Sequence, residues 1–281
     1  MSASFLRRRV AATGLGAATG LGADLGAGLL AILLPILVAV GPGARAQVPV
    51  DLALVLAVDS SASVDQTEFA LQRDGLAAGF RDPMVIAAIE SGPFKRIAVT
   101  VVEWAGYAEQ EVHIPWTLIE GGGGAHGLAD RIAGLDRRIP TGATSIAGAL
   151  GFAHTLLRAT PYDASRRVID LSGDGRNNQG PQVESVRRQV VAAGVTINGL
   201  AVVNEHPTLN YYFEDRVIGG TAAFVEVAND YGDYRRAIRR KLIREIRTLN
   251  ISGGSGPESG PERGPKRGPA PALVAAADAD R

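Results

Sequence analysis

Residues 50–58 form a nearly continuous run of small and branched apolar side chains, interrupted only by Asp51. A short apolar run without the alternation of an amphipathic strand is typical of a β-strand that is buried on both faces. Strands of this kind occur in parallel sheets with helices packed on both sides. The run therefore limits the fold more strongly than any other part of the sequence.

Segments typical of strands and helices alternate along the rest of the chain. This alternation predicts an α/β fold in a single domain, with a doubly wound, mainly parallel sheet flanked by helices. The four glycines at residues 121–124 are expected to form a flexible loop that leads into a short helix ending near residue 135. We expect further strands at residues 96–102, 111–116, 167–171, 196–202 and 223–227, and helices at residues 65–80, 144–157, 181–193 and 231–249.

Residues 1–46 have the features of a secretory signal peptide. Three arginines at residues 7–9 supply a positive start, residues 29–40 are mostly apolar, and residues 44–46 match the small-x-small pattern before a cleavage site. The apolar run is short for a membrane span, which needs about 20 residues. We therefore expect export to the periplasm or out of the cell, with an uncleaved membrane anchor as the alternative.

Residues 251–281 are rich in Gly, Pro, Ala and charged residues, and Gly-Pro recurs four times. This composition predicts a disordered tail that serves as a spacer or as a partner-binding segment. The folded domain is then expected at residues 47–250. Without the four arginines and one aspartate of residues 1–46, 25 basic and 28 acidic residues remain, which gives no support for nucleic-acid binding. The chain contains no cysteine, so no disulfide contributes to its stability.

Three groups of polar residues lie just after predicted strands or at the start of a predicted helix. Because ligands of such sheets bind beyond the carboxyl ends of the strands, we expect these groups to converge there. Together they supply two carboxylates and three hydroxyls, an all-oxygen set that suits magnesium, manganese or calcium and suits zinc poorly. The predicted metal-binding residues are Asp59, Ser61, Ser63, Thr144 and Asp174.

The order of these motifs resembles the metal-ion-dependent adhesion site of the von Willebrand factor A domain. The resemblance covers residues 50–249 and is greatest for an uncharacterised group of exported bacterial proteins with this domain. Two positions depart from the family pattern: Ala143 stands where many members have a second glycine, and Ser172-Gly173 stand where a threonine is common. Neither departure removes a metal-ligating group.

The resemblance implies a Rossmann-like A-domain fold and a bound divalent cation, magnesium before manganese or calcium. It further implies that at least one aspartate acts through water and that a carboxylate of a partner protein becomes the last ligand. On this interpretation the protein is a metal-dependent interaction module and not an enzyme. The sequence does not identify the partner. One alternative is a structural A domain whose metal only stabilises the fold.

A second alternative is a serine hydrolase. Ser61 or Ser63 would be the nucleophile, a histidine the base, and Asp174 the residue that orients it. No Gly-x-Ser-x-Gly motif surrounds either serine, and the glycine run at residues 121–124 lacks the following Gly-Lys-Ser/Thr of a phosphate-binding loop. The candidate bases are His113, His126, His154 and His206.

The last predicted helix carries an apolar stripe and several basic residues. The stripe is expected to pack on the sheet and comprises Tyr234, Ile238, Leu242, Ile246 and Leu249. The remaining faces, opposed only by Glu245, are expected to form a solvated basic surface or to contact an anionic partner or membrane. They carry Arg235, Arg236, Arg239, Arg240, Lys241, Arg244 and Arg247.

Overall fold

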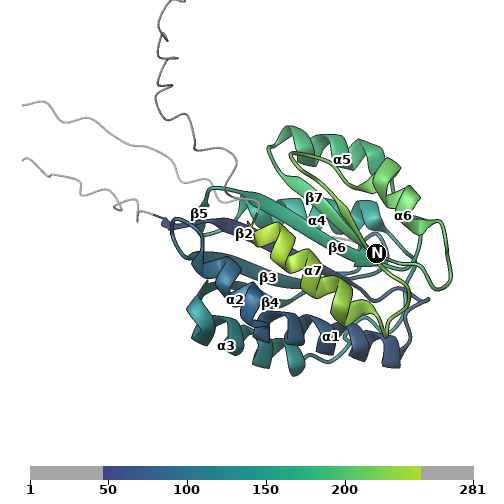
Figure 1. The fold of residues 1–281 in the computed structure, drawn as a ribbon. Coiled ribbons are helices and arrows are strands. Elements are labelled where there is room, and N and C mark those ends of the chain that lie inside the picture. The colour runs from purple at the N-terminus through teal and green to yellow at the C-terminus, as the bar shows by residue number, and fades with distance from the viewer. Residues whose placement is uncertain (1–46, 248–281) are drawn as a thin grey trace, which may run out of the picture. The chain divides into compact units, whose positions relative to one another are not determined.

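A six-stranded sheet forms the centre of residues 47–247, the part of the chain that the computed structural model describes (Figure 1). The strand order is β4-β3-β2-β6-β7-β8, and each neighbouring pair is parallel except β3 with β4. This is the doubly wound, mainly parallel sheet expected from the sequence. The strands are β2 (Leu52–Asp59), β3 (Arg96–Trp104), β4 (Gln110–Glu120), β6 (Arg167–Gly173), β7 (Thr196–Val202) and β8 (Val225–Ala228).

Helices cover both faces of this sheet (Figure 1). One face carries α1 (Gln66–Arg81), α2 (Pro83–Glu90), α3 (Gly121–Ala133) and α7 (Tyr234–Arg247). The other carries α4 (Ile146–Arg158), α5 (Val183–Ala192) and α6 (Leu209–Tyr212), which continues into a π-helical turn at Phe213–Val217. Among the helices of residues 47–247, none combines the length and apolar character that a membrane span requires. The predicted signal peptide and the predicted tail lie outside the described residues.

Strand β2 shows why the sheet needs both helical layers. All eight of its residues are buried. Even-numbered residues 52–58 pack in the cluster that contains α1 and α7, whereas odd-numbered residues 53–57 pack in the cluster that contains α4. Asp51, the polar residue in the apolar run, is also buried, and its carboxylate accepts hydrogen bonds from the Phe94 and Arg96 amides.

The glycine run at residues 121–124 is helical, so the expectation of a flexible loop was wrong. It forms the first turn of α3 directly after β4. Gly121 adopts a φ of 57°, in the left-handed region that glycine tolerates best, and the chain reverses there. A Cβ on Gly124 would lie 3.3 Å from the Ile119 Cα. The glycines therefore allow the helix to begin tightly against the end of the strand.

Several short elements were not predicted. Helix α2 begins immediately after α1, with Asp82 as its N-cap and Pro83 as its first residue. Strands β1 (Val48–Val50) and β5 (Tyr162–Ala164) pair with each other in a separate parallel ribbon, and α6 has only four residues. Elements of three or four residues are too short to show a hydrophobic period in the sequence.

Helix α7 confirms the predicted apolar stripe and corrects the predicted basic surface. Tyr234, Ile238, Leu242 and Ile246 are buried, and Leu249 lies outside the described residues. Lys241 was expected on the basic surface but is fully buried, because its ammonium group pairs with Asp170 and Glu245 in the interior.

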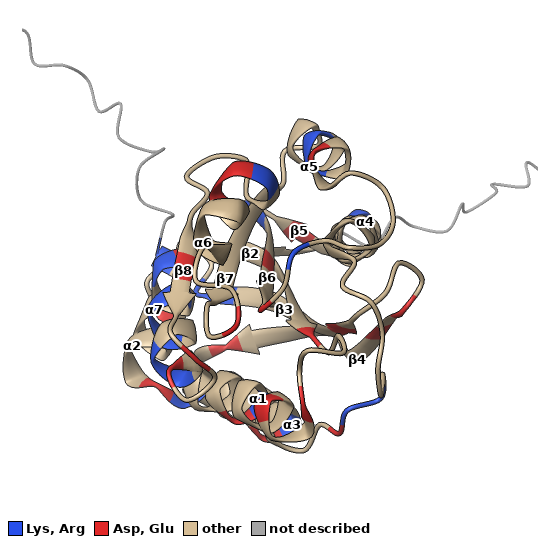
Figure 2. Ribbon diagram, turned by 90° about the vertical axis from the view of Figure 1, so that its right-hand side faces the viewer, with Lys and Arg blue, Asp and Glu red and all other residues tan. Residues whose placement is uncertain are grey.

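Ion pairs offset part of the remaining positive charge on α7. Figure 2 shows basic residues along this helix, with acidic residues from neighbouring segments among them. The pairs are Arg236 with Asp233, Arg239 with Asp82, and Arg240 with Glu226. A contact of this helix with an anionic surface stays a prediction.

Helices α1 and α7 approach closely where α1 carries glycine. A Cβ on Gly75 would lie 3.1 Å from the Arg235 Cα. Gly75→Ala should therefore lower the free energy of unfolding by about 1–3 kcal/mol, because the α7 backbone must move. Gly127 of α3 is the matched control: a Cβ there meets nothing within 4 Å. Gly127→Ala should stabilise by up to about 1 kcal/mol through helix propensity. Urea denaturation measures both, and equal effects would contradict the packing argument.

Candidate metal centre

The loops that follow β2 and β6 diverge at the carboxyl edge of the sheet. The two strands are parallel neighbours, but the chain continues from β2 to β3 and β4 on one side and from β6 to β7 and β8 on the other. In open α/β sheets, ligands bind where the strand order reverses in this way. Asp59 is the last residue of β2, and Asp174 directly follows β6. The topology therefore places both predicted carboxylates at this position.

Asp59, Ser61, Ser63 and Asp174 form one hydrogen-bonded cluster. The Ser61 amide donates to Asp59 Oδ1 over 2.8 Å. The hydroxyl oxygens of Ser61 and Ser63 lie 3.2 Å apart, and Ser63 Oγ donates to Asp174 Oδ1 over 2.7 Å. Four of the five predicted residues are thus connected by hydrogen bonds.

Thr144, the fifth predicted residue, lies beside the loop that carries Asp174. Its backbone amide donates to Asn178 Oδ1, and its carbonyl accepts from the Asn178 amide, each over 2.9 Å. A Cβ on Gly175 would lie 3.4 Å from Thr144 Oγ1. The N-cap of α4 is Ser145, whose hydroxyl accepts from the Gly148 amide. The helix therefore does not need the Thr144 hydroxyl as its cap.

Burial makes a charge on Asp59 costly. Its side chain is 0% exposed, and its Oδ2 has no hydrogen-bond partner among the described residues. Burial, and then the nearby Asp174 carboxylate, raises the pKa of Asp59 to about 7. Within residues 47–247, no basic side chain forms an ion pair with either aspartate. A divalent cation would offset both charges and give the unpaired oxygen a partner, so the residues fit such an ion.

Gly173 gives the unpaired Asp59 oxygen its space. A Cβ at this position would lie 2.8 Å from Asp59 Oδ2. The departure from the family pattern before Asp174 is therefore compatible with the site. No group of three or more His, Cys, Asp and Glu side chains suited to a metal occurs within residues 47–247. Metal binding at this position consequently depends on the hydroxyl oxygens as well as the carboxylates.

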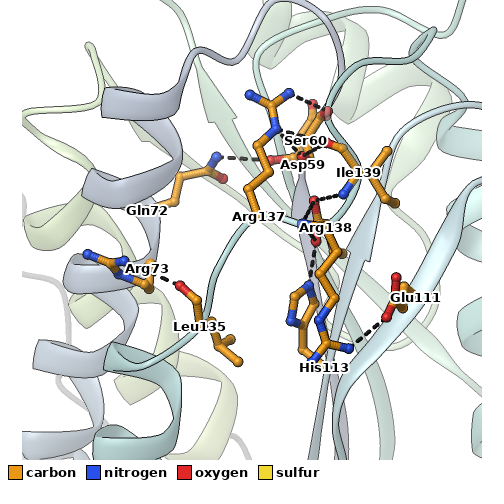
Figure 3. A network of polar contacts seen from close by, with 11 residues as sticks. Asp59, Ser60, Gln72, Arg73, Glu111, His113, Leu135, Arg137, Arg138 and Ile139 are labelled. Carbon is orange, nitrogen blue, oxygen red and sulfur yellow. Dashed lines mark hydrogen bonds and ion pairs between the residues drawn. The ribbon is translucent and has the colours of Figure 1, made fainter.

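Arg137 holds the loop that follows β2 (Figure 3). Its Nε donates to Ser60 Oγ over 2.8 Å, and its Nη2 donates to the Ser60 carbonyl over 2.9 Å. Its Nη1 donates to the Val64 carbonyl over 2.6 Å. One guanidinium group therefore fixes both ends of the segment that carries Ser61 and Ser63.

Glu103 anchors the segment that carries Arg137. Its carboxylate accepts from the Arg138 amide over 3.0 Å and the Ile139 amide over 2.9 Å, and it also pairs with His113. Burial alone would raise the pKa of Glu103, but the hydrogen bonds from His113 and these amides hold it below its ordinary value. An ionised, buried Glu103 thus connects β3 to the loop behind the site.

Two further residues position the aspartates. Gln72 Nε2 donates to the Asp59 carbonyl over 3.0 Å, and the Tyr231 hydroxyl donates to Asp174 Oδ2 over 3.0 Å. Burial and the negative charge of Asp174 raise the pKa of Tyr231, which keeps its hydroxyl a donor. Sequence reasoning missed Gln72, Tyr231 and Arg137, because they come from distant segments and belong to no motif.

The structure gives the hydrolase alternative no nucleophile–base pair. No histidine in residues 47–247 hydrogen-bonds to Ser61 or Ser63, whose hydroxyls contact each other and Asp174. His113 is paired with Glu103. The Ser–His contact on which serine activation depends is therefore not formed.

Comparison with known proteins identifies a family and a set of similar folds. The family model described as "Protein of unknown function (DUF1194)" matches residues 49–250. No curated protein matches the chain significantly. Proximal thread matrix protein 1 from the mussel byssus, in a structure with a zinc-occupied MIDAS motif, is 14% identical with a TM-score of 0.49. That match covers 72% of this chain and 48% of the mussel chain.

Two bacterial structures are also similar. The von Willebrand factor type A structure from Catenulispora acidiphila is 14% identical with a TM-score of 0.48, over 71% of this chain and 43% of that chain. The conserved hypothetical protein BatB from Bacteroides thetaiotaomicron is 12% identical with a TM-score of 0.45, over 69% and 98% of the two chains. The chain thus spans about half the length of the mussel protein and less than half of the Catenulispora protein.

Replacing Arg137 with Met should weaken binding of a divalent cation roughly 10-fold, because residues that orient ligands contribute about 10–100-fold to metal affinity. Arg138→Met is the matched control. The Arg138 guanidinium pairs with exposed Glu111 over 2.6 Å, and its backbone contact with Glu103 remains in the variant. Calorimetric titration with magnesium or manganese measures both affinities. Wild-type affinity in a folded Arg137→Met variant would contradict a positioning role.

Proposed function

The chain belongs to the family described as "Protein of unknown function (DUF1194)" and has the fold of a von Willebrand factor A domain, and we propose that it is a cation-dependent protein-interaction module. One observation carries the proposal. Two buried carboxylates, which have no basic partner among residues 47–247, meet serine hydroxyls at the point where the strand order reverses. We assign Asp59, Ser61, Ser63, Thr144 and Asp174 as the metal-binding residues.

Magnesium is the proposed ion. The donor set contains only oxygen, and the two carboxylates match the charge of a divalent cation. Manganese binds the same donors and serves as its spectroscopic substitute. Calcium requires more ligands, and the five residues supply too few unless water or a partner adds to them.

The bound ion would supply an electrophilic coordination position for an acidic side chain of a partner protein. The chain's own residues prepare that position. Arg137 and Glu103 fix the serine loop, and Tyr231 orients Asp174. Arg176 follows two residues after Asp174 and is exposed, with its guanidinium 5.5 Å above the Tyr212 ring centroid. This positive charge beside the site favours an acidic partner. We place the partner in the periplasm or outside the cell, in keeping with the proposed export.

A structural role for the ion is the second candidate, and the burial of the site favours it. Asp59 and Ser61 are 0% exposed, and Asp174 is 1% exposed. An ion that neutralises two buried carboxylates stabilises the folded state in proportion to its affinity, whether or not a partner binds. The two candidates differ in whether the bound ion accepts a carboxylate from outside the protein.

Manganese relaxation of water protons separates these candidates. We expect manganese to bind the purified protein with enhanced water relaxation, and acetate or a glutamate-rich peptide to reduce that enhancement by displacing exchanging water. Asp59→Ala should lower manganese affinity by at least about 100-fold, because one of only two anionic ligands is lost. Asp136→Ala removes an exposed carboxylate from the loop before Arg137 and should change neither result.

Thermal unfolding supplies the second readout. Stabilisation by manganese without any effect of the carboxylate probes would favour the structural role. Unchanged manganese affinity in the folded Asp59→Ala variant would contradict both candidates.

A further inference from the structure

A second group of buried charged residues lies between α7 and the sheet. Lys241 and Glu245 come from α7, Asp170 from β6 and Asn198 from β7. Their exposed fractions are 0%, 1%, 2% and 3%, respectively. This Lys241 cluster contains none of the proposed metal ligands, and the proposed function does not use it.

The ammonium group of Lys241 contacts two carboxyl groups at once. Its Nζ lies 2.6 Å from Asp170 Oδ1 and 2.6 Å from Glu245 Oε1. Asn198 Nδ2 donates to the same Glu245 oxygen over 2.9 Å, and Asn198 Oδ1 accepts from the Phe224 amide, which fixes the orientation of the amide group. Asp170 Oδ2 and Glu245 Oε2 have no hydrogen-bond partner among the described residues.

The cluster holds two carboxyl groups and one ammonium group in the interior, and the nearby Arg166 guanidinium donates to the Glu245 carbonyl over 2.6 Å. Two carboxyl groups share one ammonium group, and buried ions lose several kcal/mol of hydration each. Burial, and then the neighbouring Glu245 carboxylate, raises the pKa of Asp170 to about 8 in spite of the Lys241 ammonium group. The cluster therefore holds the Lys241 amino group in contact with both carboxyl groups, and the raised pKa of Asp170 favours the acid form of that carboxyl group.

We propose that Lys241 and Asp170 condense to an intramolecular isopeptide bond that ties α7 covalently to β6. Lys241 Nζ forms a bond to Asp170 Cγ, and one Cγ–Oδ bond breaks. Glu245 takes two protons in turn from the Lys241 ammonium group, the first of which frees the nitrogen lone pair, and delivers them to the departing Asp170 oxygen, which leaves as water. The ammonium and carboxylate groups thus become one neutral amide and one water molecule, with no change in net charge and no oxidant, reductant or cofactor.

Proximity and burial favour this condensation, which is unfavourable between separate molecules in water. Groups held in contact react with effective molarities of about 10⁵–10⁸ M. The product also replaces a buried ion pair with a neutral amide, which removes the cost of keeping two charges away from water. The enclosed site prevents hydrolysis, because its side chains are almost completely shielded from solvent.

Asp170, and not Glu245, is the carboxyl group that reacts. Asn198 donates a hydrogen bond to Glu245 Oε1, the oxygen that also contacts Lys241, and so orients Glu245 as the proton acceptor. Asp170 receives no hydrogen bond from Asn198, and its raised pKa favours the acid form from which water can leave.

Peptide mapping of the full chain tests the proposal directly. Trypsin does not cleave after an acylated lysine, so the linked protein should yield a branched peptide that joins residues 168–176 to residues 241–244, lighter than the sum of its parts by one water. Fragmentation by mass spectrometry identifies the linked side chains. Lys241→Arg keeps the charge, lacks the reactive amine and should yield no branched peptide.

Glu245→Gln tests the proton-transfer role. This variant keeps the size of the side chain and should form the linkage at least about 100-fold more slowly, in line with the usual contribution of a general base. Linkage at the wild-type rate in Glu245→Gln would overturn the role of Glu245.

Two results with the wild-type chain would overturn the bond itself. One is a folded protein that still yields only the linear peptides after prolonged incubation. The other is a cyclic peptide from residues 241–247, which would assign the linkage to Glu245. Because these measurements use wild-type protein, they decide the proposal even if the variants fail to fold.

Discussion

The burial of two carboxylates at the ends of adjacent parallel strands governs the structure around them. Neighbouring strands flank β2 on both sides and helices cover both faces of the sheet, so water does not solvate Asp59. The Arg137 guanidinium, which holds the loop after β2, is bound to loop carbonyls and a serine hydroxyl and does not pair with the aspartates. The fold thus keeps two carboxyl groups without a basic partner among residues 47–247 at the strand-order reversal, an arrangement that favours the cation proposed as the ligand.

The loop around these carboxyl groups is held in place by contacts to the protein itself. Arg137 fixes the serine segment, and Glu103 fixes the backbone next to Arg137. Gln72 reaches Asp59 from α1, and Tyr231 reaches Asp174 from the segment before α7. Contacts of this kind reduce the reorganisation that binding would otherwise require. A site that is arranged before the ion arrives can bind tightly with only two charged ligands.

The sequence predicted the features that follow from local patterns. Buried strands show apolar runs, so β7 was predicted with its observed bounds and β2 within two residues at each end. The five candidate site residues could be proposed because each lies at or just after the end of a predicted strand or at the start of a predicted helix, and their role as metal ligands stays a prediction. Side chains that act across the fold could not be predicted in this way. The sequence spacing of Lys241 is that of a surface residue on α7. Its ion pair with the buried Asp170 depends on how α7 packs against β6, which the local sequence does not show.

Helix α7 and the residue before it contact both the candidate metal centre and the Lys241 cluster, and the contacted residues lie on β6 or directly after it. Along β6, the residues that face α7 alternate with apolar residues that face α4. Tyr231, just before α7, contacts Asp174, Tyr234 contacts Ser172 over 3.4 Å, and Lys241 contacts Asp170. The apolar stripe of α7 alone would tolerate a shift along the sheet, because hydrophobic contacts are not directional. Hydrogen bonds and ion pairs do fix the position. Lys241 lies well inside α7, away from the sheet edge that carries the candidate metal centre. Its ion pair with Asp170 nevertheless helps to fix the position of α7, and so the position of the Tyr231 hydroxyl against Asp174.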